Sequence, residues 1–314
     1  SITHNNDLYA HLHYCITIPF DRYVEIREHD RDAYRTRRDF SPLRWSGIEL
    51  TALIRKRLLK FLLVQGKPFR DDKELTLVGR LDAVLTAVSP DVPREIEIEY
   101  DGNRFTVPLF LYILRHSFWR PRDILYYFAH ILAAFKVTGS RKSSLRLDDD
   151  FVKQLIKQAT RGLIKDEFIG EFKDVCSNFS DVIELFDGSK QIIDFSEFYE
   201  LTKGTPFQLV AAEYQCTDEH EKLEFLYRIG FLGVIAPEAI RLRNGLYKYS
   251  FTFNEDRVLT ETITPKRYRE CKFIIHPVFC EYLQLKLEDN PEFLLNFDWK
   301  YLNDNENRRG LGPT

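Results

Sequence analysis

The chain has 314 residues, a hydrophobic content of 44% and a formal net charge of −3, with an isoelectric point of about 6.3. This length and apolar content suffice for roughly two domains with hydrophobic cores, which excludes a chain that is disordered throughout. The nearly balanced charge gives no overall positive field, so binding of nucleic acid or anionic lipid would need a local basic patch.

Membrane and secretion signals are missing from the sequence. The densest apolar run, Leu58–Val64, is short and interrupted by Lys60, and the start lacks a basic-then-apolar signal peptide. Five cysteines at irregular spacings favour reduced thiols over a disulfide framework. We therefore predict a cytoplasmic protein. Methionine is absent altogether, and one explanation is that the sequence is a fragment.

The first predicted element is a strand at Tyr14–Ile18, which is short, β-branched and apolar. This composition is typical of a strand buried on both faces of a parallel sheet. The first hundred residues contain no comparable set of strands to pair with it, which indicates the second half of a larger α/β unit. Charges dominate Arg22–Phe40, and a solvated face with mixed salt bridges explains them better than a phosphate-binding loop does.

Ser46 and Glu49 have the spacing of a capping box and predict the start of an amphipathic helix. The helical spacing continues through Leu50, Leu53, Ile54, Leu58, Phe61 and Leu62. Gly66 and the following Lys67-Pro68 end this helix. They do not form a phosphate loop, because proline stands where a serine or threonine should bind magnesium. Further on, alternating residues in 95–109 around Asp101-Gly102 predict a β-hairpin.

A second strong helix signal begins at Pro121 and runs to about Lys136. Proline suits a first helical position, and Asp123 favours the positive end of the helix dipole. The apolar stripe consists of Ile124, Phe128, Ile131 and Phe135. Arg120 and Arg122 lie at the N-terminal end of this helix, where they either contact a phosphate or pair with neighbouring acids.

The polar segment 136–147 is the best candidate for a domain boundary. We expect a helix capped by Asp148, two short helices at Val182–Phe186 and Phe195–Leu201, and a helix that begins at Thr217-Asp218 and ends at Gly230. Alternation in Tyr247–Phe253 and a returning strand at Phe273–Ile275 complete a winged helix-turn-helix pattern. After Pro277 we predict a last helix, although Leu283, Leu285 and Leu287 also fit a strand.

The charge of the helix after Asp218 bears on DNA binding. It carries four acids, Asp218, Glu219, Glu221 and Glu224, against Lys222 and Arg228, so phosphates should repel it. The wing region is more basic and offers weak candidates for contact with a nucleic-acid backbone, namely Lys266, Arg267, Arg269 and Lys272. We favour a winged helix that contacts protein over one that reads DNA.

Chemical motifs are scarce. Cys271, His276 and Cys280 form the only compact set of metal-competent side chains, and a structural zinc site needs four ligands. We expect Cys280 to pack in the core and His276 to end a strand, so no metal site is predicted. Asp148, Asp149 and Asp150 are best explained by helix capping and dipole. No catalytic motif is present, so the sequence leaves enzymatic activity undecided.

Arg120-Pro121-Arg122-Asp123 and its apolar helix resemble the start of the helical lid in bacterial P-loop ATPases related to the STAND class, which are signal-transducing nucleotide switches. Upstream, Tyr14–Asp21 resembles their last core strand, and Leu43–Ser46 with Glu49-Leu50 resembles their "W-S-x-x-E-L" helix entry. Downstream, Leu226–Gly233 and Ile275–Phe279 are similar to the winged-helix end of such proteins.

The resemblance implies an α/β to mostly α chain with the remnant of a P-loop core, a helical lid and a C-terminal winged helix-turn-helix. The expected divisions are an ATPase-like core end with following helices (1–110), a lid helix and linker (111–147), a helical and winged-helix domain (148–287) and a tail (288–314). ATP and Mg²⁺ are implied by resemblance alone, since neither a Walker A lysine nor Walker B acids are identifiable. Asp21, Arg120 and Arg122 would sense the nucleotide phosphates.

The function implied is a nucleotide-dependent regulatory switch, in bacterial stress or phage defence by analogy. A protein partner or self-association is expected, DNA is weakly supported, and no membrane is involved. Two alternatives stay open. One is a non-enzymatic winged-helix DNA-binding protein, which would bind duplex with a strong salt dependence. The other is a scaffold or interaction protein that uses its Phe- and Tyr-rich surfaces to form a stable oligomer.

Overall fold

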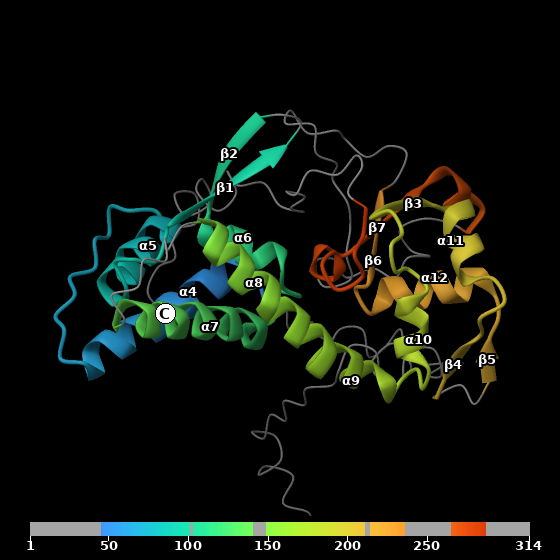
Figure 1. Ribbon diagram of the computed structural model, residues 1–314, viewed down its shortest axis with the longest axis horizontal. Coiled ribbons are helices and arrows are strands. Elements are labelled where there is room, and N and C mark those ends of the chain that lie inside the picture. Colours follow the sequence, from blue (N-terminus) through green and yellow to red (C-terminus); the bar gives the residue numbers. More distant parts are fainter. Residues whose placement is uncertain (1–44, 101–102, 141–148, 211–213, 236–264, 287–314) are drawn as a thin grey trace, which may run out of the picture. The chain divides into compact units, whose positions relative to one another are not determined.

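The computed structural model describes residues 45–100, 103–140, 149–210, 214–235 and 265–286. In these residues the fold is mixed α/β and mostly helical, with small antiparallel sheets (Figure 1). The strand predicted at Tyr14–Ile18, Asp21 and the alternating segment Tyr247–Phe253 lie outside the described residues. Within these ranges, no helix is both long and apolar enough to cross a membrane.

The N-terminal described elements are helices around one hairpin. They are α4 (Gly47–Val64), α5 (Leu77–Val88), β1 (Glu95–Tyr100), β2 (Asn103–Pro108), α6 (Leu109–Arg115), α7 (Pro121–Ser140) and α8 (Asp149–Leu163). The capping box at α4 is confirmed, because Ser46 Oγ accepts from Glu49 N at 3.2 Å and Glu49 Oε2 accepts from Ser46 N at 2.8 Å. Gly66 follows the helix with φ +65°, a left-handed conformation that glycine adopts without strain.

The predicted hairpin is also confirmed. β1 and β2 pair antiparallel from Glu95 opposite Pro108 to Tyr100 opposite Asn103. Ile96 and Val107 lie opposite each other and are both buried, so this pair faces the core. The alternation of apolar and acidic residues in the sequence therefore reflects one buried and one solvated face.

The first hydrophobic cluster packs α4 against α5, and α7 against both α4 and α8 (Figure 1). α6 is different from these amphipathic helices, because all seven of its residues are buried. In α7 the predicted apolar stripe is confirmed as buried: Ile124, Phe128, Ile131 and Phe135. The helical spacing of these residues thus places them on the core face of α7.

The C-terminal described elements are shorter. They are η1 (Ile164–Phe168, a π-helix), α9 (Ile169–Lys173), α10 (Phe179–Glu184), β3 (Ile192–Asp194), α11 (Phe195–Thr202), β4 (Phe207–Leu209), β5 (Tyr214–Cys216), α12 (Glu219–Arg228), β6 (Leu232–Ile235), η2 (Pro265–Glu270), β7 (Lys272–Ile275) and η3 (Pro277–Phe279). β3, β7 and β6 form an antiparallel sheet in that order, and β4 pairs with β5. The predicted helix after Asp218, the strand at Phe273–Ile275 and the short helix at Phe195–Leu201 are confirmed. The short helix predicted at Val182–Phe186 is present but runs from Phe179 to Glu184.

A second hydrophobic cluster holds these elements together and is rich in aromatic side chains. Phe118, which lies between α6 and α7, belongs to it. Its ring stacks on Phe168 with centroids 4.6 Å apart and lies 4.8 Å from His276. The segment that joins α6 to α7 is therefore anchored in the second cluster, whereas the two helices pack in the first.

The continuous helix predicted after Pro277 is wrong. The chain forms the single turn η3 and then irregular turns, with Gln284 at φ +49°. Its backbone pairs instead with a neighbouring segment: Lys286 N donates to Ser189 O at 2.8 Å and Gln191 N donates to Lys286 O at 3.1 Å. These long-range hydrogen bonds satisfy the backbone groups that a helix would have paired internally. The strand alternative for Leu283 and Leu285 is not found in the described part of this segment either. Leu283 N donates to Phe279 O within a turn, and only Lys286 forms an isolated bridge, with Lys190.

Candidate functional site

The segment between α6 and α7 positions the two predicted arginines. Trp119 has φ +56°, a left-handed conformation that costs a non-glycine residue about 1 kcal/mol. Neighbouring hydrogen bonds hold this bend, since Trp119 N donates to Ser117 Oγ at 3.3 Å and Phe118 N donates to Asp123 Oδ2 at 3.2 Å. The strained bend turns the chain directly into the first turn of α7, where Arg120 and Arg122 lie.

Both arginines are paired with glutamates from the following helical run. Arg120 Nη1 lies 2.6 Å from Glu171 Oε2, and Arg122 Nε lies 2.8 Å from Glu167 Oε2. Arg122 Nη2 is also 3.6 Å from Glu171 Oε2. We call Arg120, Arg122, Glu167 and Glu171 the arginine–glutamate cluster. Of the two roles considered for these arginines, ion pairing is the arrangement present here, and phosphate contact stays a hypothesis.

Asp123 follows Arg122 in the first turn of α7, and its side chain is only 1% exposed. Burial raises the pKa of its carboxyl group, although Arg120 and the hydrogen bond from Phe118 N act in the opposite direction. Its role is to receive the Phe118 backbone donor at the start of α7. A carboxylate in the first helical turn is also favoured by the helix dipole, as the sequence suggested.

Two buried histidines, His116 and His276, contact this region through hydrogen bonds and ring packing. Tyr112 O accepts from His116 Nδ1 at 2.8 Å, which leaves His116 Nε2 as the acceptor for Arg115 Nη1 at 3.2 Å. Burial, with a smaller effect of Arg115, lowers the pKa of His116 to about 3. Burial and His116 also lower the pKa of His276, whose Nδ1 accepts from Val278 N at 3.1 Å. Both imidazoles are therefore neutral at physiological pH and serve as hydrogen-bonding core residues.

The glutamates of the cluster lie on a distinctive element. Glu167 belongs to the π-helix η1, which continues α8 and leads into α9, and Glu171 belongs to α9. α8 packs in the first hydrophobic cluster, whereas Ile164, Phe168 and Ile169 pack in the second. π-helical turns are rare and often occur at functional sites. The cluster thus attaches the start of α7 to the element that runs between the two cores.

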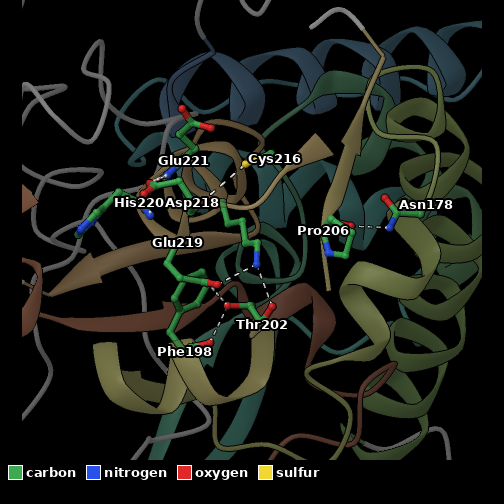
Figure 2. Close-up of polar contacts among 10 residues, drawn as sticks. Asn178, Phe198, Thr202, Pro206, Cys216, Asp218, Glu219, His220 and Glu221 are labelled. Atoms are coloured by element: carbon green, nitrogen blue, oxygen red, sulfur yellow. Dashed lines mark hydrogen bonds and ion pairs between the residues drawn. The ribbon is translucent and has the colours of Figure 1, made fainter. Parts of the chain in front are cut away.

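A second polar site, which the sequence did not predict, lies at the start of α12. Lys222 is 2% exposed, and its Nζ donates to Glu219 Oε1 at 2.8 Å and to Thr202 O at 2.9 Å. Figure 2 shows Thr202 and Glu219 facing each other, with the Thr202 hydroxyl 2.5 Å from Glu219 Oε2. We call Lys222, Glu219 and Thr202 the buried lysine network. A lysine three residues after a glutamate was the only sequence signal for it.

A hollow of about 500 Å³ opens beside this network. It is formed by α11, the turn after it, the start of α12 and η2. Its lining includes Phe195, Tyr199, Lys203, His220, Lys222 and Arg269. Asp218 is the N-cap of α12, because its Oδ1 accepts hydrogen bonds from His220 N at 2.9 Å and from Glu221 N at 3.1 Å.

The weak nucleic-acid candidates come from one stretch. Lys266, Arg267 and Arg269 belong to η2, and Lys272 begins β7. Arg267 Nε lies 3.2 Å from Glu270 Oε2, and the other three side chains are exposed. Arg269 also lines the hollow. These positions are compatible with contact to a polyanion, which stays a prediction.

For metal binding, the described ranges contain no group of three or more His, Cys, Asp or Glu side chains placed to hold an ion. Cys271 Sγ donates to Arg267 O at 3.3 Å, and His276 caps η3. Both side chains are buried.

Comparisons with known proteins add no family assignment. No family model, no curated protein and no solved structure matches the chain.

Proposed function

We propose that the chain is the regulatory part of a nucleotide-dependent switch, in which Arg120 and Arg122 exchange Glu167 and Glu171 for nucleotide phosphates. The observation that supports this most is the shared use of Glu171 on α9 by both arginines. ATP with Mg²⁺ is the nucleotide suggested by the resemblance to STAND-related P-loop ATPases. Hydrolysis is not part of the proposal.

The energetics of the arginine–glutamate cluster favour an exchangeable contact. The arginine side chains are 34% and 56% exposed, and those of Glu167 and Glu171 are 33% and 44% exposed. Ion pairs with this exposure contribute about 0 to 1 kcal/mol each. A phosphate offers more charge and a geometry that matches the guanidinium fork. Phosphate binding could therefore replace these pairs at little cost.

The consequence of such an exchange would be mechanical. Release of Glu167 and Glu171 would remove the ion pairs that join η1 and α9 to the start of α7, while Phe118 stays stacked on Phe168 of η1. Since η1 joins α8 to the second hydrophobic cluster, a change there would alter how the C-terminal elements are held. A segment with two ion-pairing arrangements is a recognised way to build a switch.

The C-terminal elements would transmit the signal as a winged helix that contacts protein. Support comes from their order, α10, β3, α11, α12, β6 and β7, and from the placement of β7 between β3 and β6. The acids on α12 argue against DNA as the partner. Two of them, Asp218 and Glu219, are engaged in capping and in the buried lysine network, so they also have structural roles.

The test is calorimetric titration of the whole chain with ATP and Mg²⁺. We expect saturable, magnesium-dependent binding that Arg120→Ala/Arg122→Ala weakens at least tenfold, because two charge-assisted contacts are lost. Glu167→Gln/Glu171→Gln should strengthen binding by removing the competing acids. Arg161→Ala/Lys165→Ala removes the same charge from the adjoining helical run and should leave binding unchanged. No binding, or equal weakening in both double-alanine variants, would overturn the proposal for this chain.

A further inference from the structure

Part of the lining of the hollow beside α12 is aromatic. Phe195 and His220 stack with ring centroids 5.4 Å apart and an interplanar angle of 17°. Tyr199, on the same helix as Phe195, is 46% exposed. All three line the hollow. Phe195 is partly buried, whereas Tyr199 and His220 are exposed, and exposed aromatic rings are suited to stacking against a planar group.

Among the charged side chains that line the hollow, the two acids and two lysines are already engaged, whereas within the described ranges Arg269 is not. Asp218 Oδ1 is used by two backbone donors of α12. Glu219 uses one oxygen for Lys222 and the other for Thr202. Lys203 forms an ion pair with Glu200. Arg269, in contrast, is exposed and has no ion-pair partner among the residues that the structure describes.

The buried lysine network makes the hollow a preformed site. Lys222 joins the start of α12 to the last turn of α11 through Thr202 O. Glu219 joins the same two helices through the Thr202 hydroxyl (Figure 2). The two helices that carry the aromatic residues are therefore held together by hydrogen bonds from buried groups. A volume of about 500 Å³ lies within the usual range for small-molecule sites.

We infer that this hollow binds a small ligand that joins a flat ring to an anionic group, such as a nucleoside monophosphate. The ring lies against the Phe195, Tyr199 and His220 side, and the anion is held by the guanidinium of Arg269. Arginine is suited to this role because its planar fork binds phosphate and carboxylate oxygens in pairs. The inference uses none of the arginine–glutamate cluster and does not depend on the proposed function.

The experiment is calorimetric titration of the full chain with AMP. We expect saturable binding, weakened about tenfold or more by Arg269→Ala through loss of a charge-assisted contact, and weakened by Tyr199→Ala through loss of stacking. Lys266→Ala is the matched control, because Lys266 is an exposed cation in the same η2 turn but does not line the hollow. Its binding should equal that of the parent chain.

Two competition arms identify the recognised chemistry. Adenosine and inorganic phosphate should each displace AMP much less well than AMP itself binds. No saturable binding at millimolar AMP, equal losses in Arg269→Ala and Lys266→Ala, or displacement by phosphate alone at AMP-like concentrations would overturn the inference. Arg120→Ala/Arg122→Ala should leave AMP binding unchanged, so failure of this site and failure of the proposed switch are distinguishable.

Discussion

The arginine–glutamate cluster and the buried lysine network use the same chemistry in opposite surroundings. In the first, cations and carboxylates meet at a surface where each side chain is at least 33% exposed. In the second, Lys222 is 2% exposed and Glu219 is 15% exposed. Water screens the first set and makes it exchangeable, whereas the second must stay fully hydrogen-bonded to offset its desolvation. Burial therefore separates a contact suited to switching from one suited to holding a site in shape.

The largest effect should come from breaking the buried lysine network. Lys222→Met keeps the apolar stem but leaves Glu219 without its cation, and should lower the free energy of unfolding by about 3 kcal/mol. Urea unfolding measures the change. Lys203→Met, an exposed lysine at the end of α11, serves as the control and should change stability little. Equal stability of Lys222→Met and the parent chain would show that this network is as dispensable as a surface pair.

A second effect concerns pH. The pKa of His116 is lower in the folded chain, at about 3, than its ordinary value of 6.5. The contribution of neutral His116 to the free energy of unfolding is therefore complete above pH 6.5. As pH falls below that value, this free energy decreases by about 1.4 kcal/mol per pH unit until the pKa of the folded chain is reached. His116→Gln should reduce the slope, and the pKa of His276, which is also lowered, accounts for part of the slope that remains. Urea unfolding at several pH values measures it, and identical slopes in both proteins would contradict the assignment.

Asp82 is an intermediate case, a partly buried carboxyl that feels the charge of the partly buried Arg94. Burial raises its pKa to about 6, against a lowering effect of Arg94. Because the folded pKa is raised, the stabilising contribution is complete below the ordinary pKa of 3.8 and is lost as pH rises through 6. Asp82→Asn should stabilise the chain at pH 7 by about 1 to 2 kcal/mol, after allowance for partial exposure. The gain should vanish near pH 4 in thermal unfolding experiments.

The smallest change in stability is expected at the arginine–glutamate cluster. Arg120→Ala/Arg122→Ala should lower the free energy of unfolding by less than about 1 kcal/mol, and the effect should shrink further in high salt. Urea unfolding at low and high salt checks both points. A loss above 2 kcal/mol that salt does not reduce would mean that these pairs hold the fold, and the contrast with the buried lysine network would disappear.

Local signals in the sequence were sufficient for several elements. Ser46 and Glu49 predicted a capping box that forms within one turn, and Asp101-Gly102 predicted a hairpin between adjacent segments. The segment after Pro277 was harder, because Lys286 satisfies its backbone through Ser189 and Gln191, far away in sequence. Periodicity cannot detect such a partner, so helical spacing was a poor guide there.

By itself, the sequence determined the starts and the buried faces of α4 and α7, because caps and apolar spacing act over a few residues, whereas it did not predict α5 or α6. It also placed Arg120 and Arg122 at the start of a helix. Only the tertiary structure decided that Arg120 meets Glu171, 51 residues away, and that α11, α12 and η2 enclose one hollow around Lys222. Both arrangements depend on how segments that are distant in sequence pack together, and on how far that packing excludes water from each charged group. The spacing of residues along the chain encodes neither.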